Sequence, residues 1–190
     1  MNNQLKKYLK ELRAYGIANN IPNVTDEVGM FLHMMIKVKQ PEAILEIGCA
    51  NGYSTIFMAE AARQVGSKVI TVDHSAPTFA EAQKNLTEVG LADYVNFNFG
   101  DAREVLPAMK EPANFDFVFV DGQKASYIDF WNLLEDRLNP GAVLVWDDMM
   151  KFAQKTKTLS EAVQDLPGFD QVLIPIDGDD AILLMLKHEK

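Results

Sequence analysis

Apolar, strand-like runs alternate with helix-like segments along this chain, and this alternation restricts its fold more than any other feature. The runs are AILEIG (43–48), KVITVD (68–73), YVNFNF (94–99), FDFVFVD (115–121), AVLVWD (142–147), QVLIPI (171–176) and AILLMLK (181–187). Such continuously apolar runs are typical of strands covered on both faces, as in a parallel sheet. The intervening segments predict helices at 53–65, 77–89, 102–110, 125–138 and 150–166. The alternation predicts an α/β protein with a doubly wound, Rossmann-like sheet.

The two ends of the chain complete this predicted architecture. Only the DGDD segment at 177–180 joins the last two runs, too short for a crossover helix, so they form an antiparallel hairpin after five parallel strands. At the start, a second helix fits 26–38 after the N-cap candidate Thr25, and the first helix has one apolar face made of Leu5, Tyr8, Leu9, Leu12 and Tyr15. The length suits a single domain, 1–190, with a helical cap at 1–40 and a sheet core at 41–190.

Composition and charge exclude several classes of protein. Cys49 is the only cysteine, so no internal disulfide can form, and the three histidines lack the spacing of a zinc site. The start is polar and no apolar stretch reaches about 18 residues, which predicts a cytoplasmic protein that does not enter a membrane. A net charge of −9 argues against nucleic-acid binding over the whole surface, while a local basic patch stays open.

Acidic residues follow or end five successive predicted strands: Glu46, Asp73, Asp101, Asp121 and the pair Asp147-Asp148. In a doubly wound sheet these strand ends meet at one edge, where ligands bind. Clustered like charges repel one another, and burial raises the cost of keeping them ionised. The sequence therefore predicts a cationic ligand at this edge, although each acid taken alone could be a helix cap. Adjacent acids directly after AVLVW favour a divalent-metal site.

The first strand leads into the turn GCANG (48–52), which is typical of a loop whose backbone lies against a cofactor. Nicotinamide enzymes use G-x-G-x-x-G at this point, and the residues Cys49, Ala50 and Asn51 supply no middle glycine. A nicotinamide cofactor is therefore the less favoured choice. The simpler alternative is that Gly48 and Gly52 only turn the chain.

Taken together, ILEIGCANGYST, VITVD, GDA, FVFVDGQKASY and PGAVLVWDDM resemble, in order and spacing, the metal-dependent S-adenosylmethionine O-methyltransferases. The resemblance covers roughly residues 20 to 187. Within that family, the chain is similar to the bacterial relatives of catechol and caffeoyl-CoA O-methyltransferases. It implies S-adenosylmethionine as cofactor, with Asp73 on the ribose and His74 beside the adenine. It further implies cofactor contacts from Val24 in the IPNVT segment (21–25), Glu46, Gly48, Tyr53, Ser54, Asp101, Ala102 and Asp121.

The same resemblance implies a divalent cation, Mg²⁺ or otherwise Mn²⁺ or Ca²⁺, bound by Asp121, Asp147 and Asp148. The third ligand is typically Asn in the family, whereas this chain has Asp148, so three carboxylates would surround the cation. Lys124 matches the catalytic lysine and acts with Asp121. It would handle the acceptor's proton, provided that its own pKa is lowered near the metal.

The expected function is methyl transfer to a small hydroxylated, catechol-like acceptor by a homodimeric enzyme. One alternative is a tRNA wobble-uridine O-methyltransferase, which would need a basic surface. The chain offers only the clusters Lys151, Lys155 and Lys157, and Lys6, Lys7, Lys10 and Arg13. Another is a metal-free homologue that binds the cofactor without catalysis.

Overall fold

The computed structural model describes residues 1–189, without the side chain of Asp177. Its centre is a seven-stranded sheet in the order β3-β2-β1-β4-β5-β7-β6. The strands are β1 (Ala43–Ile47), β2 (Lys68–Asp73), β3 (Val95–Phe99), β4 (Phe115–Val120), β5 (Leu138–Trp146), β6 (Phe169–Asp177) and β7 (Asp180–Lys187). The first five are parallel, and β7 runs antiparallel to both β5 and β6. The predicted doubly wound sheet with a C-terminal antiparallel hairpin is confirmed.

The strand order reverses direction at β1, which pairs with β2 on one side and with β4 on the other. Strands β2 and β3 are added on one side of β1, and β4 then pairs with the other side of β1. The connections after β1 and β4 therefore leave the sheet toward opposite faces. In sheets of this kind the crevice opened at such a switch point is where ligands bind.

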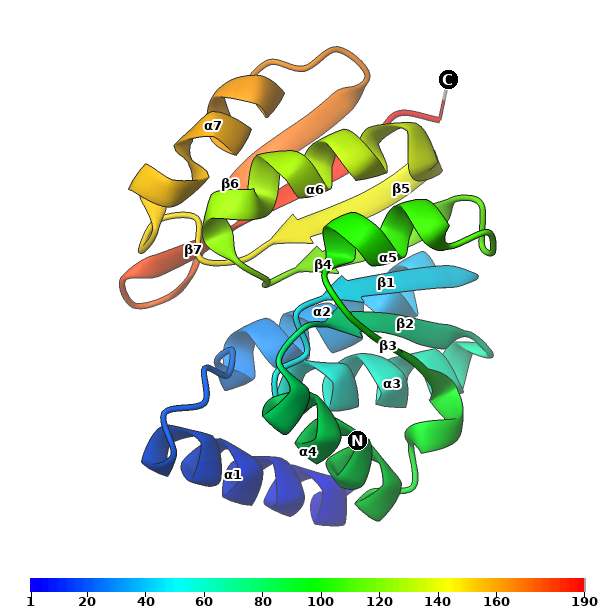
Figure 1. The fold of residues 1–190 in the computed structure, drawn as a ribbon, viewed down its shortest axis with the longest axis vertical. Helices are drawn as coiled ribbons and strands as arrows, with labels where there is room; N and C mark the ends of the chain where they lie inside the picture. The colour runs from blue at the N-terminus through cyan, green and yellow to red at the C-terminus, as the bar shows by residue number, and fades with distance from the viewer. Residues whose placement is uncertain (190) are drawn as a thin grey trace.

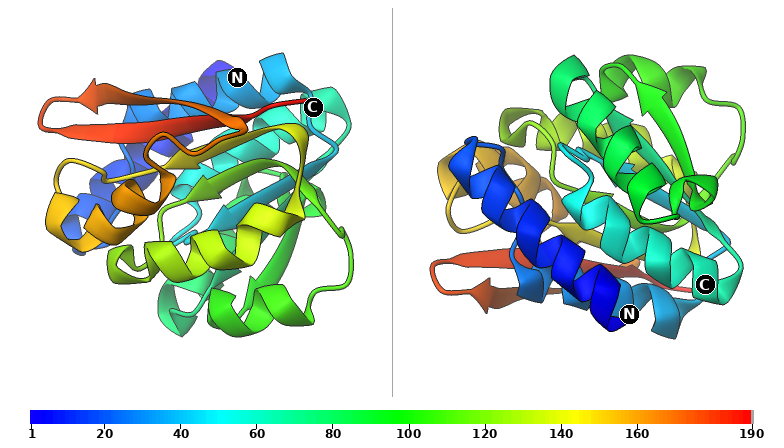
Figure 2. Two further views of the ribbon diagram at one scale, coloured as in Figure 1. Left: turned by 90° about the horizontal axis from the view of Figure 1, so that it is seen from above. Right: turned by 90° about the horizontal axis from the view of Figure 1, so that it is seen from below.

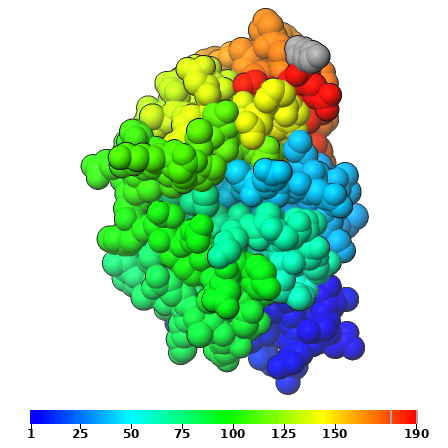
Figure 3. Space-filling model, turned by 90° about the vertical axis from the view of Figure 1, so that its right-hand side faces the viewer, coloured from blue at the N-terminus to red at the C-terminus, as the bar shows by residue number. Residues whose placement is uncertain are grey.

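Helices cover both faces of the sheet (Figures 1 and 2). One layer contains α1 (Asn3–Ala18), α2 (Asp26–Lys39), α3 (Tyr53–Val65) and α4 (Ala76–Glu88), and the other contains α5 (Ala102–Ala108), α6 (Tyr127–Leu134) and α7 (Ala153–Val163). Each layer forms its own apolar core, represented by Leu32 and Ile56 on one face and by Tyr127 and Trp146 on the other. Figure 3 shows α1 at one end of the molecule and the segment around β6 at the opposite end.

Local sequence signals explain where several elements begin. The side chain of Thr25 accepts a hydrogen bond from the N–H of Val28 at 3.3 Å, so it caps α2 as the sequence predicts. The predicted apolar face of α1 is buried at Leu5, Leu9 and Leu12, but Tyr15 is 47% exposed. None of the helices within residues 1–189 combines the length and the hydropathy needed to cross a bilayer.

Two predicted helices are wrong at their ends. The helix expected at 125–138 is only α6, flanked by 3₁₀ turns at Lys124–Ser126 and Glu135–Arg137. Strand β5 already begins at Leu138, because this buried residue pairs with Phe115 of β4. The pairing of the two strands shifts its register beyond that point, where Pro140 has no N–H to donate. The helix expected at 150–166 is the shorter α7.

Candidate active site

A cavity of about 1020 Å³ opens at the carboxyl edge of the sheet. Its size suits a cofactor together with a small acceptor, since pockets for single drug-sized ligands measure about 300–1000 Å³. It brings together nearly all of the predicted site residues: Val24, Gly48, Tyr53, Ser54, Asp73, His74, Asp101, Ala102, Asp121, Lys124, Asp147 and Asp148. Glu46 is the predicted site residue that is missing from this lining.

The loop after β1 is held in place by close packing at its two glycines. Gly48 has a φ of +96°, and a Cβ there would meet the carbonyl oxygen of Asp121 at 2.5 Å. Gly52 has a φ of +87°, and a Cβ there would meet Cδ2 of Leu86 at 2.8 Å. Protein atoms therefore account for both glycines, through their backbone conformation and their close contacts. The prediction of a cofactor contact at Gly48 then rests on its place in the cavity wall.

Asp73, at the end of β2, binds the backbone of this loop. Its Oδ2 accepts hydrogen bonds from the N–H groups of Cys49 and Ala50, each at 2.9 Å, and its Oδ1 accepts one from Ser75 at 2.8 Å. A carboxylate oxygen can accept more than one hydrogen bond, so the side chain keeps acceptor capacity toward the cavity. Asp73 thus joins the loop after β1 to the loop after β2.

Glu46 lies behind the loop, and its side chain is fully buried. Its oxygens accept hydrogen bonds from the hydroxyl groups of Ser54 at 2.6 Å and of Thr55 and Thr71 at 2.7 Å each. Burial raises the pKa of Glu46 to about 7, although these three donors favour the ionised form. Glu46 thus joins β1, β2 and the start of α3 from inside the protein, and its predicted contact with the cofactor has no support from the cavity lining.

The segment before α2 is tied to the loop by a short polar chain. Arg13 donates from Nη1 to the carbonyl oxygen of Val24 at 2.5 Å and lies 3.7 Å from Asp26. The hydroxyl of Tyr53 donates to the same Asp26. Burial, together with the charge of Asp26, raises the pKa of Tyr53, so the phenol stays protonated. These contacts hold Val24 and Tyr53 in the wall of one cavity.

On the adenine side predicted from sequence, Asp101 caps α5. It accepts a hydrogen bond from the N–H of Arg103 at 2.9 Å and pairs with Nη2 of Arg103 at 2.5 Å. The hydrogen bonds from Arg103 lower the pKa of Asp101 to about 2, so this carboxylate is ionised at neutral pH. His74 and Ala102 line the cavity in the same region of the sheet edge.

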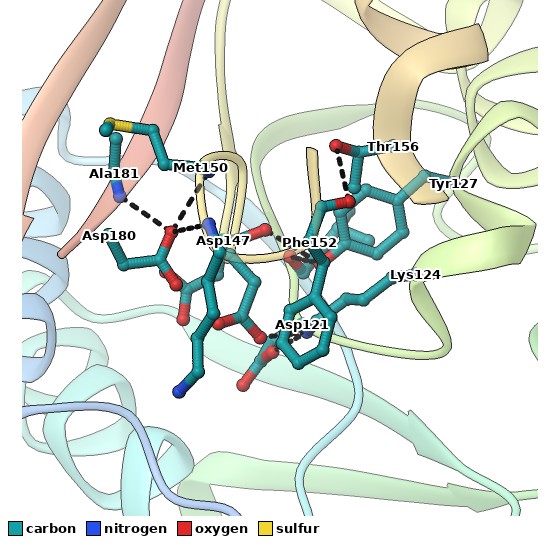
Figure 4. A network of polar contacts seen from close by, with 12 residues as sticks. Asp121, Lys124, Tyr127, Asp147, Met150, Phe152, Thr156, Asp180 and Ala181 are labelled. Atoms are coloured by element: carbon teal, nitrogen blue, oxygen red, sulfur yellow. Dashed lines mark hydrogen bonds and ion pairs between the residues drawn. The ribbon is translucent and has the colours of Figure 1, made fainter. Parts of the chain in front are cut away.

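The acids after β4 and β5 meet at the other end of the cavity (Figure 4). Asp121, Asp147 and Asp148 each offer an oxygen, and these oxygens lie within 4.8 Å of one another. Asp148 has a φ of +59°, an uncommon conformation for a residue other than glycine. Behind them, the hydroxyl of Tyr127 lies 3.1 Å from the carbonyl oxygens of Val120 and Asp147 and so ties the ends of β4 and β5 together.

Lys124 is the positive charge within this cluster. Its Nζ donates a hydrogen bond to Asp121 and lies 2.7 Å from Oδ2 of Asp148. Burial opposes the charge on Lys124, but the neighbouring carboxylates outweigh it and raise its pKa above the usual value. The expectation from the sequence is the opposite: a pKa of Lys124 that is lowered by a metal ion beside it.

The carboxylates respond to the same environment. Burial raises the pKa of Asp121 and, with the charges of Asp121 and Asp148, raises that of Asp147 well above its usual value. Burial also raises the pKa of Asp148 to about 6, although Lys124 opposes the shift. One lysine does not offset three acids. Hard oxygen donors at this spacing fit a divalent cation such as Mg²⁺, which would supply the missing positive charge.

The family model for O-methyltransferases matches residues 1–177. The chain belongs to the O-methyltransferase family.

Relatives and solved structures agree with this membership. A catechol O-methyltransferase of Niastella koreensis is 30% identical over 168 residues, which cover 86% of this chain and 76% of the relative. Caffeoyl-CoA O-methyltransferase 1 of Arabidopsis thaliana is 30% identical over 75% of this chain, which spans only 57% of that protein's length. The O-methyltransferase TomG of Streptomyces achromogenes, solved in complex with S-adenosylmethionine, has a TM-score of 0.83 and 25% identity, with 99% of this chain and 91% of that one covered.

The TomG structure contains S-adenosylmethionine, the cofactor that the sequence resemblance implies for this chain. The cavity contains the cofactor-binding residues predicted by resemblance, apart from Glu46, and it also contains the acid cluster with Lys124. The loop after β1 and the acid cluster thus line one partly enclosed cavity.

Several cavity residues of this O-methyltransferase were not predicted as parts of its site. Asp180 appeared in the sequence only as part of the hairpin turn, while Lys151 and Lys155 appeared as a surface cluster. Phe152 was assigned to the body of a helix. The four-residue spacing of the two lysines directly after the paired acids is the signal that could have placed them beside the site.

Proposed function

We propose that this O-methyltransferase methylates one hydroxyl of a small acceptor with two neighbouring hydroxyl groups, such as a catechol, with the aid of a divalent cation. The observation that carries this proposal is the meeting of Asp121, Asp147 and Asp148 with Lys124 in the cavity of the cofactor loop. The catechol O-methyltransferase activity of the relative from Niastella koreensis supports the same acceptor class.

The reaction makes one bond and breaks one. The acceptor oxygen forms a bond to the methyl carbon while the bond from that carbon to the sulfonium sulfur breaks, and its electron pair stays on sulfur. The products are the methyl ether, S-adenosylhomocysteine and the proton of the acceptor hydroxyl. Because a cation and an anionic oxygen neutralise one another, orientation of the two reactants and supply of the anionic oxygen are the main tasks of the protein.

Residues at the two ends of the cavity serve different parts of this reaction. Asp73 and the loop after β1 would hold the cofactor, in the same cavity as the acids. Lys124 contributes a fixed positive charge, which stabilises the anionic form of the acceptor oxygen. A divalent cation held by Asp121, Asp147 and Asp148 would lower the pKa of an acceptor hydroxyl and orient two neighbouring oxygens.

Methyl transfer to catechol, followed by mass spectrometry with and without Mg²⁺, tests this proposal. Asp121→Ala removes a carboxylate that no neighbour replaces, and we expect a loss of at least about 100-fold in kcat/KM. Asp148→Asn keeps an oxygen ligand, and we expect it to retain Mg²⁺-dependent transfer. Asp136→Ala, which removes an exposed acid outside the cavity, is the matched control. Undiminished transfer after exhaustive chelation would exclude the role of the cation and favour a metal-free homologue.

A tRNA acceptor is the alternative, because Arg13, Lys151 and Lys155 line the cavity. Recognition through phosphates would make kcat/KM fall by orders of magnitude between about 50 and 200 mM salt. A neutral catechol would show little dependence on salt. Methylation of tRNA with a steep salt dependence, and no transfer to catechol, would replace the proposal by this alternative.

A further inference from the structure

Two lysine ammonium groups lie near the ring of Phe152. Nζ of Lys155 lies 5.2 Å from the ring centroid, and Nζ of Lys151 lies 5.9 Å from it. All three residues line the cavity that also contains Lys124 and the acid cluster. An aromatic surface flanked by two positive charges therefore borders the space that the acceptor has to enter.

These two ammonium groups have no anionic partner among the side chains that the structure describes. Lys157, further along α7, pairs with Glu161 at 3.5 Å, whereas Asp179 and Asp180 line the same cavity as the two lysines without forming an ion pair with either. The chain has 27 acidic residues and 18 basic ones, so acids are not scarce. Like charges four residues apart repel, and Lys155 also lies in the first turn of α7, at the positive end of the helix dipole.

The segment that carries the lysines is held by a buried carboxylate rather than being a loose part of the surface. Oδ1 of Asp180 accepts hydrogen bonds from the N–H groups of Met150 and Lys151, each at 3.1 Å, and of Ala181 at 2.7 Å (Figure 4). Asp180 is only 7% exposed. These bonds hold the backbone of Lys151 at a defined place, three residues beyond Asp148.

We propose that Lys151 and Lys155 bind an anionic group of the acceptor, a carboxylate on its aromatic ring, while that ring lies against Phe152. The inference rests on the proposed function, because the same acceptor must present its two hydroxyl groups to the acid cluster. It narrows the substrate class from catechols in general to catechols that carry an acidic substituent. Two positive charges beside an anion in a partly enclosed cavity favour the acid over a neutral analogue of the same shape.

A matched pair of ligands tests this subsite: 3,4-dihydroxybenzoate and its neutral analogue 3,4-dihydroxybenzamide. Calorimetry with the full chain, Mg²⁺ and S-adenosylhomocysteine gives the affinity of each without turnover, and initial rates with S-adenosylmethionine give KM and kcat. We expect the acid to bind about five- to tenfold more tightly than the amide, mainly through KM, with a preference that weakens as salt rises.

Variants connect that preference to the two lysines. In Lys151→Gln combined with Lys155→Gln, we expect the ratio of affinities for acid and amide to fall to about one. Lys157→Gln, which removes an exposed lysine of α7, should keep the ratio of the unmodified protein. Thermal unfolding of each variant shows whether the fold is retained, and the single variants serve if the double variant unfolds.

The outcomes separate the subsite from the function on which it rests. Equal affinity for acid and amide in the unmodified protein overturns the subsite, whatever turnover is found. A preference for the acid that survives in the double variant also overturns it. A lysine-dependent preference without methylation of either ligand supports the subsite and contradicts the catechol activity. Methylation of tRNA instead of the small acid overturns both.

Discussion

The ammonium nitrogen of Lys124 lies 2.7 Å from Oδ2 of Asp148 and also donates a hydrogen bond to Asp121. The Lys124 side chain is only 12% exposed, so these pairs are largely shielded from water. Removal of one partner from a buried ion pair leaves an uncompensated charge and costs about 3–5 kcal/mol. Lys124 therefore stabilises the acid cluster in addition to any role in methyl transfer.

Lys124→Met should lower the melting temperature in the presence of a chelator, because three carboxylates then lack their internal cation. Protonation of a carboxylate limits the loss, so we expect about 2 kcal/mol, or roughly 4–8 °C. Mg²⁺ should raise the melting temperature of the variant more than that of the unmodified protein. Thermal unfolding with and without Mg²⁺ measures both effects. Lys157→Met is the control, and equal Mg²⁺ increments in all three proteins would contradict this account.

Asp73→Ala should weaken cofactor binding by about 1.5–3 kcal/mol, the range for hydrogen bonds to a charged group. The variant also loses the acceptor for the N–H groups of Cys49 and Ala50, so the loop becomes less ordered. Calorimetric titration with S-adenosylhomocysteine measures the affinity. Asp73→Asn keeps one oxygen acceptor and should lie between the two proteins. Unchanged affinity in Asp73→Ala would remove this residue from the cofactor site.

The stability of the protein should fall as pH rises, in part because of Glu46. Its pKa is raised by burial from 4.5 to about 7, so the folded state binds this proton more tightly than the unfolded chain does. The resulting stabilisation is fully present below about pH 4.5 and is lost as pH rises through about 7, with a size on the order of 3 kcal/mol. Glu46→Gln is neutral at every pH and removes this contribution.

Urea unfolding at pH 5, 6, 7 and 8 checks the role of Glu46. We expect the free energy of unfolding of the unmodified protein to fall relative to that of Glu46→Gln across this range. Other buried acids, such as Asp147, titrate in both proteins and so cancel in the difference. Parallel curves would mean that Glu46 is ionised at neutral pH in the folded protein, with Ser54, Thr55 and Thr71 as sufficient donors.

Asp180→Ala should disturb the acceptor end of the cavity while leaving the cofactor end intact. The N–H groups of Met150, Lys151 and Ala181 lose their shared acceptor, and Asp148 lies only two residues before Met150. We expect Mn²⁺ binding and the acceptor KM to weaken by about tenfold, with unchanged affinity for S-adenosylhomocysteine. Asp180→Asn offers the same oxygen acceptor and should restore most of the loss. A uniform loss of cofactor and metal binding would instead indicate general destabilisation.

The sequence predicts the sheet and the position of the acid cluster because both depend on local patterns. Apolar runs identify strands, and the acids that follow them meet at one edge whatever the details of the helices. The helix boundaries near Leu138 and Lys151 could not be predicted in the same way. They depend on a pairing with Phe115 and on hydrogen bonds to Asp180, residues that are distant in sequence.

The orientation of individual side chains could not be predicted from the sequence either. Glu46 and Asp73 look alike in sequence as acids at the ends of neighbouring strands. Glu46 turns toward hydroxyl groups from α3 and β2, whereas Asp73 turns toward backbone N–H groups and the cavity. Partners from three separate elements decide the difference, and no single stretch of sequence contains them.

The position of β7 inside the sheet has a consequence for synthesis of the protein. β7 follows β6 in sequence, yet it lies between β5 and β6, so the outer edge of β5 stays unpaired until Lys187 has been added. A ribosome adds about 5–20 residues per second, so the apolar edge that ends at Trp146 stays open for roughly 2 to 8 s. An open strand edge can pair with another chain. The nascent protein is therefore most exposed to aggregation at this edge between the synthesis of β5 and that of β7.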